Sequence, residues 1–161
     1  MAVEMFLDID GVPGESQADK FKDKIDIFSY SLGASNPTSV STGSGSGAGK
    51  VSISSMSIQK IVDKSTDKLF LACCQGKHFT KGKLTVREAG GDSPVEYLVM
   101  DFTQLFVDSI SWGGATGGEK PSESVSFSFA TFKLLYKEQT GTGSGTAAGE
   151  VGWDLQKNTK F

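Results

Sequence analysis

The sequence has very few of the residues on which metal and thiol sites depend. It contains one histidine and two cysteines, Cys73 and Cys74, which are neighbours in the chain. A single histidine cannot supply a multi-histidine metal cluster, and no Cys-x-x-Cys spacing replaces it. Adjacent cysteines rarely satisfy the geometry of a disulfide. We therefore expect no metal, no cofactor and two reduced thiols.

Long apolar runs and an excess of basic charge are missing as well. The apolar stretches are a few residues long, whereas about 20 residues are needed to span a bilayer. Acidic side chains at Glu4, Asp8 and Asp10 occupy the region where a secretory signal needs an apolar core. Sixteen Lys and Arg residues against nineteen Asp and Glu give a net charge of −3. We expect no membrane insertion, no ordinary signal peptide and no nucleic-acid partner.

Glycine is abundant, with 20 among 161 residues, and only 37% of the residues are hydrophobic. This composition disfavours a long helical bundle, and the length suits one domain over residues 1–161. Apolar and polar residues alternate with a period of two along most of the chain, which predicts a mainly β fold. The expected strands are 2–9, 25–33, 50–61, 78–89, 94–101, 103–112, 122–136 and 150–156.

One segment, about 65–75, has the pattern of a short α-helix. Asp63 or Ser65 can cap its start, and Gly76 can close its end. The expected inner face carries the residues Leu69, Ala72 and Cys73.

Two tracts are rich in glycine and small polar residues, at 34–49 and 139–149. The first is predicted to be a long loop without regular structure. Its end, with Gly49 and Lys50, resembles a phosphate-binding loop, but Ser44 stands where that motif needs glycine and Val51 where it needs a hydroxyl. Strands are expected on both sides, so no helix N-terminus can hold a phosphate. We reject a nucleotide site.

Serine occupies one face of several expected strands. It stands at every second position from 122 to 128, opposite Val125 and Phe127. Ser29 and Ser31 have the same parity in the second strand. The face is either an ordinary solvent face of an antiparallel sheet or the lining of a water-filled passage, which the cargo enters without being held by charge.

The segment 95–107 carries large apolar side chains on both parities, and a small sheet cannot bury both faces unless something covers the second. The cover is the helix, another copy of the chain, or both. The candidate subunit-interface residues are Val95, Tyr97, Val99 and Phe102.

No group of residues makes a convincing active site. Cys73, Cys74 and His78 are close in sequence, but a cysteine on the inner face of a helix is usually a packing residue. Asp101 lies between Met100 and Phe102, yet one acid in an apolar segment does not establish acid–base chemistry. We therefore do not expect an enzyme.

The order of these pieces resembles the Hcp (haemolysin-coregulated protein) family, which forms the inner tube of the type VI secretion system. The resemblance covers essentially the whole chain, and the order and spacing of the fragments together make it specific. The fragments are 1–7, 14–16, 25–27, 29–33, 47–51, 63–66, 72–73, 76–78, 83–87, 90–91, 95–98 and 152–155.

The resemblance implies a two-sheet antiparallel β-barrel with one flanking helix. It also implies rings of six copies that stack into a tube, with partners that are a contractile sheath, a VgrG-like spike protein and secreted effectors. Export through that machine needs no signal peptide, so synthesis in the cytoplasm followed by secretion is expected. The rival hypothesis is a monomeric or dimeric β-barrel that binds a small ligand or a glycan, or a hydrolase on such a scaffold.

Within this tube hypothesis, three groups of residues have expected roles. Ser29 and Ser31 face the lumen, and the apolar residues of 95–107 contact a neighbouring subunit. The Gly-rich stretch is expected to contact the next ring in the stack. Its residues are Thr42, Gly43, Ser44, Gly45, Ser46, Gly47, Ala48, Gly49 and Lys50.

Overall fold

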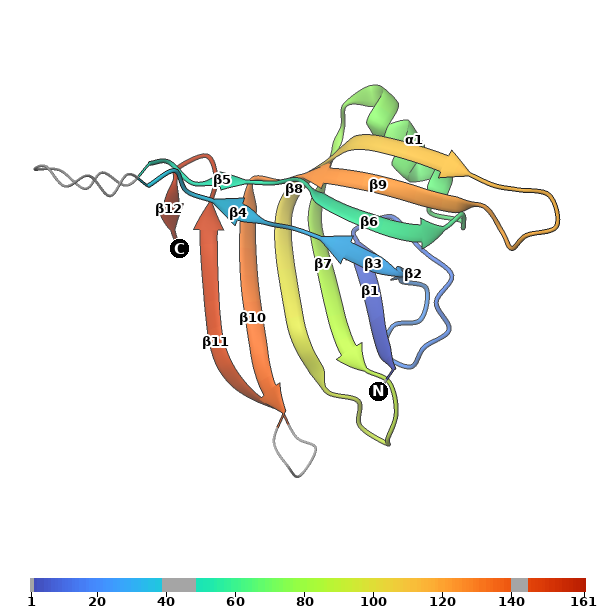
Figure 1. Cartoon of the computed structure of the whole chain (residues 1–161), viewed down its shortest axis with the longest axis horizontal. Coiled ribbons are helices and arrows are strands. Elements are labelled where there is room, and N and C mark those ends of the chain that lie inside the picture. The colour runs from blue at the N-terminus through green and yellow to red at the C-terminus, as the bar shows by residue number, and fades with distance from the viewer. Residues whose placement is uncertain (1, 39–48, 140–144) are drawn as a thin grey trace, which may run out of the picture.

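The computed structural model describes residues 2–38, 49–139 and 145–161 (Figure 1). These residues form one α-helix and a set of antiparallel strands, so the mainly β class is confirmed. The elements are β1 (Val3–Ile9), β2 (Ile25–Asp26), β3 (Ser29–Ser31), β4 (Ala34–Ser35), β5 (Ser52–Ile53), β6 (Met56–Ile61), α1 (Thr66–Gln75), β7 (His78–Glu88), β8 (Glu96–Gly113), β9 (Ser122–Ser128), β10 (Thr131–Gln139), β11 (Gly145–Asp154) and β12 (Thr159–Lys160).

Ten of the strands belong to one sheet, which folds over to make two layers. The first layer has the order β12-β11-β10-β8-β7-β1-β2, and the second continues from β8 through β9 and β6 to β3. Strands β1, β7, β10 and β11 run side by side with the first half of β8. Strands β9, β6 and β3 form the second layer and run at a steep angle to these strands (Figure 1). Among the described strands no pairing joins the ends of this path, so the expected barrel is an open, folded sheet.

Strand β8 is shared by both layers. Its first half pairs with β7 and β10, and its second half pairs with β9. The sequence suggests two strands, 94–101 and 103–112, but the structure has one strand of 18 residues. The chain turns between layers at Gln104, whose φ is +52°. Gly82 on β7 makes room there, because a Cβ atom on it would lie 2.9 Å from Leu105 Cδ2.

The core lies between the two layers and under the helix. Leu7 and Leu84 of the first layer meet Ile58 and Phe127 of the second, and all four side chains are buried. The predicted helix is confirmed: α1 begins after Ser65 and ends at Gly76, which has a left-handed φ of +64°. Its expected inner face is also confirmed, because Leu69 and Ala72 are buried and Cys73 packs against the core.

Within the predicted strand 25–33, the alternation holds from residue 29 onward, because Ser29 and Ser31 are exposed while Tyr30 and Leu32 pack against the core. It fails at the two preceding residues, where the Phe28 side chain is 60% exposed and Ile27 is buried. The reason is a change of partner between the two residues. The Ile27 N–H donates to the carbonyl of Met5 on β1, whereas the Phe28 N–H donates to the carbonyl of Gln59 on β6. The chain therefore passes from one layer to the other, and the alternation restarts.

The loop prediction for 34–49 is partly wrong. Ala34 and Ser35 pair with Ile53 and Ser52, so strands β4 and β5 form a separate two-stranded sheet. The expected strand 50–61 is divided into β5 and β6, with a break at Ser54 and Ser55. Residues 39–48 lie outside the described residues. The described limbs of this excursion lead from β3 and β6 toward the end of the molecule where β12 lies (Figure 1).

Two further strand boundaries differ from the prediction. The expected strand 122–136 is divided into β9 and β10, which lie in different layers of the sheet. The last expected strand, 150–156, begins earlier, because β11 includes the part of the glycine-rich tract from Gly145 onward.

Candidate functional site

The most unusual surface of the protein is a sheet face covered with hydroxyl groups, which we name the serine face. Strands β3, β6, β9 and β8 lie side by side, and paired residues of antiparallel strands point to the same side. The first row across the four strands is Ser29, Gln59, Ser124 and Ser111. The second row is Ser31, Ser57, Ser126 and Ser109.

Hydrogen bonds between neighbouring strands hold part of the serine face. Ser57 Oγ and Ser126 Oγ are 3.0 Å apart, and Ser124 Oγ donates to Gln59 Oε1 at 2.6 Å. Ser29, Ser31, Ser109 and Ser111 are exposed. The structure therefore brings the two predicted lumen residues into a neutral, hydroxyl-rich surface, to which β8 contributes two serines that the sequence analysis did not single out.

One charged side chain lies at the edge of the serine face. Asp108 is the extra residue of an irregularity in β8, where the register against β9 shifts between Val107 and Ser109. Its Oδ2 atom accepts hydrogen bonds from the hydroxyls of Ser55, at 2.8 Å, and Ser128. The two serines thus hold the carboxylate against the face.

The opposite side of the same four strands is apolar and buried. Ile58 and Val125 pair across β6 and β9, and Tyr30 and Ile110 extend this row on either side. All four belong to, or pack against, the core. The alternation of strand side chains therefore separates a dry face from a hydroxyl face.

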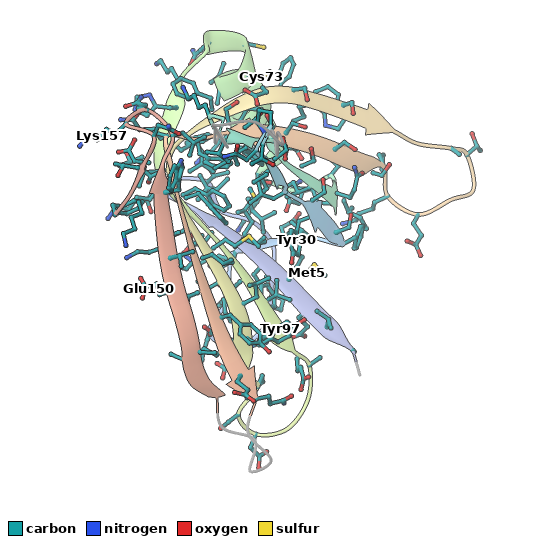
Figure 2. The ribbon with its side chains drawn as sticks, turned by 60° about the vertical axis from the view of Figure 1, so that its left-hand side comes forward. Met5, Tyr30, Cys73, Tyr97, Glu150 and Lys157 are labelled. Atoms are coloured by element: carbon teal, nitrogen blue, oxygen red, sulfur yellow. The ribbon has the colours of Figure 1, made fainter. Side chains whose placement is uncertain are left out.

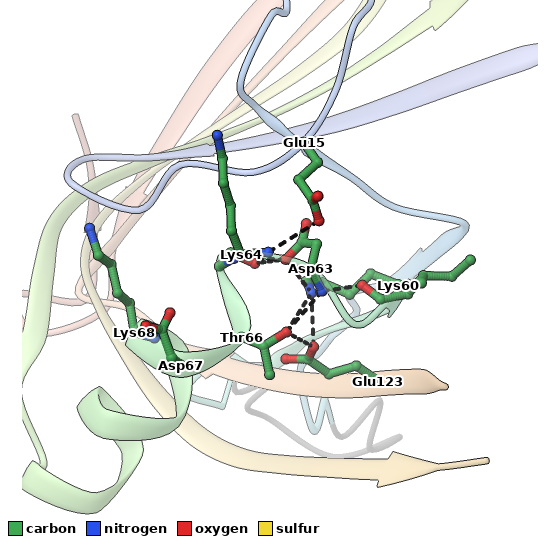
Figure 3. A network of polar contacts seen from close by, with 10 residues as sticks. Glu15, Lys60, Asp63, Lys64, Thr66, Asp67, Lys68 and Glu123 are labelled. Carbon is green, nitrogen blue, oxygen red and sulfur yellow. Dashed lines mark hydrogen bonds and ion pairs between the residues drawn. The ribbon is translucent and has the colours of Figure 1, made fainter. Parts of the chain in front are cut away.

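A buried ion pair ends this apolar side at the start of α1 (Figure 3). Lys60 Nζ lies 2.8 Å from Glu123 Oε2 and 3.0 Å from Asp63 Oδ1. The Thr66 hydroxyl donates to Glu123 Oε2 at 2.6 Å. Charges removed from water require such partners, so this network attaches the first turn of α1 to β6 and β9.

The sequence analysis missed this network, although a signal was present. Glu123 has the parity of Val125 and Phe127 in its strand, and Lys60 has the parity of Met56 and Ile58. Two residues of opposite charge, each on the buried face of its strand, indicate a buried ion pair when the two strands are neighbours. The sequence did not show that β6 and β9 are neighbours.

Two of the four predicted interface residues are core residues. Phe102 is 1% exposed, and its ring lies 4.8 Å from that of Phe129, centroid to centroid. Val99 is 7% exposed and lies in a row with Phe6 and Thr85. This second face is covered within the chain, because Phe21 from the connection after β1 stacks on Phe6. Neither Val99 nor Phe102 is therefore available to a neighbouring subunit.

The other two predicted interface residues, Val95 and Tyr97, are half-buried near the first residues of β8. Tyr97 lies far from Cys73 on the helix, toward the opposite end of the molecule (Figure 2). Both residues remain accessible in part, and they stay candidates for an interface.

Exposed apolar side chains gather at a different place, between α1 and the end of β8. Phe70 and Leu71 on the helix are exposed, and Trp112 on β8 is 48% exposed. The rings of Phe70 and Trp112 have centroids 5.4 Å apart. We name Phe70, Leu71 and Trp112 the helix patch. Large aromatic side chains left in water are common where another protein binds.

Most of the predicted ring-stacking stretch, from Thr42 to Ala48, lies outside the described residues. Of its last two residues, Gly49 is half-buried and Lys50 is exposed. Gly49 lies against Pro37, since a Cβ atom on Gly49 would be 2.6 Å from the Pro37 carbonyl oxygen. The two limbs of the excursion therefore stay close together beyond β4 and β5.

Burial affects two titratable groups without producing a reaction centre. Burial raises the pKa of the Asp26 carboxyl, and the nearby carboxylates of Asp63 and Glu4 add to the shift, while a hydrogen bond with Ser16 opposes it. Burial also raises the pKa of Tyr30, with a smaller contribution from Tyr97. A polar hollow of about 420 Å³ lies beside Asp26. Within the described residues, no group of three potential ligands is arranged to hold a metal ion.

Comparison with known proteins assigns this arrangement to a family. Residues 6–136 match the sequence model of a family described as the type VI secretion system effector Hcp. The chain belongs to the Hcp family. It is also 38% identical to protein hcp1 of Pseudomonas aeruginosa over 161 residues, which is 99% of each chain. The resemblance found in the sequence is thus confirmed, and the chain is a tube protein of type VI secretion.

Solved structures of type VI secretion proteins have the same fold. A structure described as a type six secretion system protein has a TM-score of 0.93 at 31% identity and covers 99% of this chain and 100% of its own. Hcp1 from Salmonella typhimurium has a TM-score of 0.81 at 33% identity, with both chains fully covered. None of the described helices is long and apolar enough to cross a membrane. The Hcp family is a family of secreted proteins, and this chain is one of them.

Proposed function

We propose that this chain is the subunit of six-membered rings that stack into a secretion tube, with the serine face lining the lumen. The observation that carries the proposal is the serine face itself. Two complete rows of hydroxyl and amide side chains cross four strands, and each row is neutral. A purely structural sheet face in water usually carries charged residues, which keep it soluble.

A neutral hydroxyl lining suits a passage that must hold a protein and later release it. A single hydrogen bond to a hydroxyl contributes only about 0.5–1.5 kcal/mol, because water competes for the same groups. Many such contacts hold a cargo of varied sequence, while none of them dominates its release. The proposed cargo is the secreted effector proteins.

A closed ring requires two different surfaces of the subunit to match each other. The helix patch supplies one apolar surface, and its aromatic side chains are of the kind found at the centre of interfaces. Val95 and Tyr97 remain candidates for a second contact. The proposed interface between subunits therefore uses exposed residues in place of Val99 and Phe102, which are buried in the subunit.

Stacking of rings is assigned to the excursion between β4 and β5. Its limbs lead away from β3 and β6 (Figure 1), and the predicted stretch from Thr42 to Lys50 belongs to this excursion. Ordering about seven mostly Gly and Ser residues costs on the order of 7 kcal/mol per subunit, so stacking is weak until contacts with the next ring offset that cost. A spike protein and a contractile sheath supply the template and the driving force, and the protein leaves the cytoplasm without a signal peptide.

Two experiments test the proposal together. Native mass spectrometry and negative-stain microscopy of the purified chain should show rings of six subunits. A Ser31→Cys variant, in a background with Cys73 and Cys74 replaced by serine, should react quickly with a small maleimide and slowly with one too large to enter the ring. A monomer or dimer would contradict the ring and favour a binding module for a ligand or glycan. Equal labelling rates would place Ser31 outside the lumen.

A further inference from the structure

Asp108 is the only formally charged residue that the strand register and the hydrogen bonds place on the serine face, within the part of the chain that the structure describes. We propose that Asp108 is the contact that selects cargo: it binds a guanidinium or ammonium group of the transported protein. This inference rests on the proposed function, in which the serine face lines the lumen.

The local backbone accounts for the position of this carboxylate. An extra residue in one strand of a pair re-aims its side chain, and irregularities of this kind are frequent beside functional sites. Val107 is buried and Ser109 is exposed, so strict alternation cannot hold across the three residues, and Asp108 and Ser109 are both exposed. The register shift brings Asp108 to the hydroxyls of Ser55 and Ser128.

The hydrogen bonds leave the carboxylate free to accept a ligand. Ser55 and Ser128 both donate to Oδ2, and Oδ1 accepts no hydrogen bond from the described residues. The Asp108 side chain is exposed. Two hydroxyls therefore fix the orientation of the group and leave its second oxygen without a donor among the described residues. A guanidinium fits such an acceptor well, because charge-assisted hydrogen bonds are about twice as strong as neutral ones.

The neutral surroundings increase the effect of a single charge. Hydroxyl and amide groups provide no competing cation, so the field of Asp108 is not cancelled by a neighbour on the face. In a ring, one carboxylate per subunit forms a circle of like charge around the lumen. At 0.1 M salt the field of an exposed charge extends about 10 Å, so a basic segment in the passage meets it before contact.

The test uses intact rings of the full-length chain and three fluorescein-labelled hexapeptides, made of arginine, glutamate or serine. Binding is measured by fluorescence anisotropy at low and high salt. Asp108→Asn keeps the shape and an acceptor for both hydroxyls but removes the charge. The matched control is Asp101→Asn, on the same strand but away from the serine face, where Asp101 lies 3.7 Å from Lys83 in an exposed ion pair.

We expect the arginine peptide to bind wild-type rings most tightly and to lose affinity at high salt. Asp108→Asn rings should bind it about fivefold more weakly or worse, and Asp101→Asn rings should bind it as the wild type does. Rings of Asp108→Asn with wild-type affinity would overturn the inference and leave the tube intact. If that variant does not assemble, the wild-type rings decide: equal binding of the arginine and glutamate peptides also overturns it. A wild-type chain without rings overturns the proposed function instead.

Discussion

Lys60 and Glu123, which come from neighbouring strands, face each other across 2.8 Å with both side chains fully buried. Each strand otherwise sends only apolar residues to this side of the sheet, so the pair is isolated from water and from other cations. Lys60 also donates to the Ile61 carbonyl on its own strand. The other side-chain contacts of the pair are to Asp63, just before α1, and to Thr66, its first residue. The position of the helix on the sheet is therefore set by charge as well as by packing.

Removing one member of this pair should be far more damaging than removing both. Lys60→Met leaves the buried Glu123 carboxylate without a cation, and we expect a loss of about 3–5 kcal/mol in the free energy of unfolding. Glu123→Gln should lose less, because Lys60 still pairs with Asp63. The double variant Lys60→Met with Glu123→Leu should recover most of this loss. Urea denaturation of the four proteins measures the coupling, and single losses that simply add in the double variant would contradict it.

A charge in the helix patch should separate assembly from folding. Trp112→Asp puts a carboxylate on an exposed site, so the subunit should stay folded, while rings dissociate because the charge would be buried at an interface. Size-exclusion chromatography with circular dichroism distinguishes the two effects. Unaltered rings would remove the helix patch from the interface.

Phe102→Ala should have the opposite effect to Trp112→Asp, although the sequence pattern predicts Phe102 at the interface. Its ring packs against Phe129 and Phe132 inside the subunit. The cavity should cost about 3–5 kcal/mol of stability. The expected result is a lowered melting temperature, with rings still present at temperatures where the variant is folded. A variant with normal stability but no rings would return Phe102 to the interface.

Deleting residues 43–48 should abolish stacking and leave rings intact. The limbs of the excursion are close together, since Gly49 lies against Pro37, so a short turn can close the gap without distorting β4 and β5. Electron microscopy should show single rings and no tubes, and export should stop. Tubes or secretion at normal levels after the deletion would refute the assignment.

The raised pKa of Asp26 has a defined effect on stability. Burial disfavours the charged carboxylate in the folded state, so the protonated group is tolerated better. Stability therefore falls as the pH rises from 3.8, the ordinary pKa of an Asp carboxyl, through the raised pKa of the folded state. Asp26→Asn should therefore be more stable than the wild type at pH 7, and the difference should disappear below about pH 4. Asp92→Asn, in the exposed connection after β7, is the control. An equal difference at both pH values would contradict this explanation.

Local sequence patterns were sufficient to predict an element when the whole segment packs against a single neighbouring part of the fold. The helix was predictable because Leu69, Ala72 and Cys73 share one face and Gly76 can adopt a left-handed φ. The serine alternation in β9 was predictable for the same reason. The environment of the hydroxyl face of β9, whether bulk solvent or a lumen, depends on other subunits. It was therefore not predictable from the sequence of one chain.

The failures occurred where the chain changes partners. Phe28 has the parity of a buried residue, but the hydrogen-bond partner changes from β1 to β6 between Ile27 and Phe28. Val99 looked unpartnered because the segment that covers its side of the sheet, which includes Phe21, is polar and far away in sequence. Pairing between distant strands sets both outcomes, and no pattern within either segment contains that information.

The sharing of β8 between the two layers has a mechanical consequence. Because one uninterrupted backbone runs from Asp101 in the first layer to Ser111 in the second, a force applied to either layer reaches the other through covalent bonds. Sliding the layers apart would require rupture of backbone hydrogen bonds to β7, β9 and β10 together, instead of one bond at a time. In the proposed tube, a subunit built in this way would deform little under a sudden load and would move as a rigid piece when the sheath contracts.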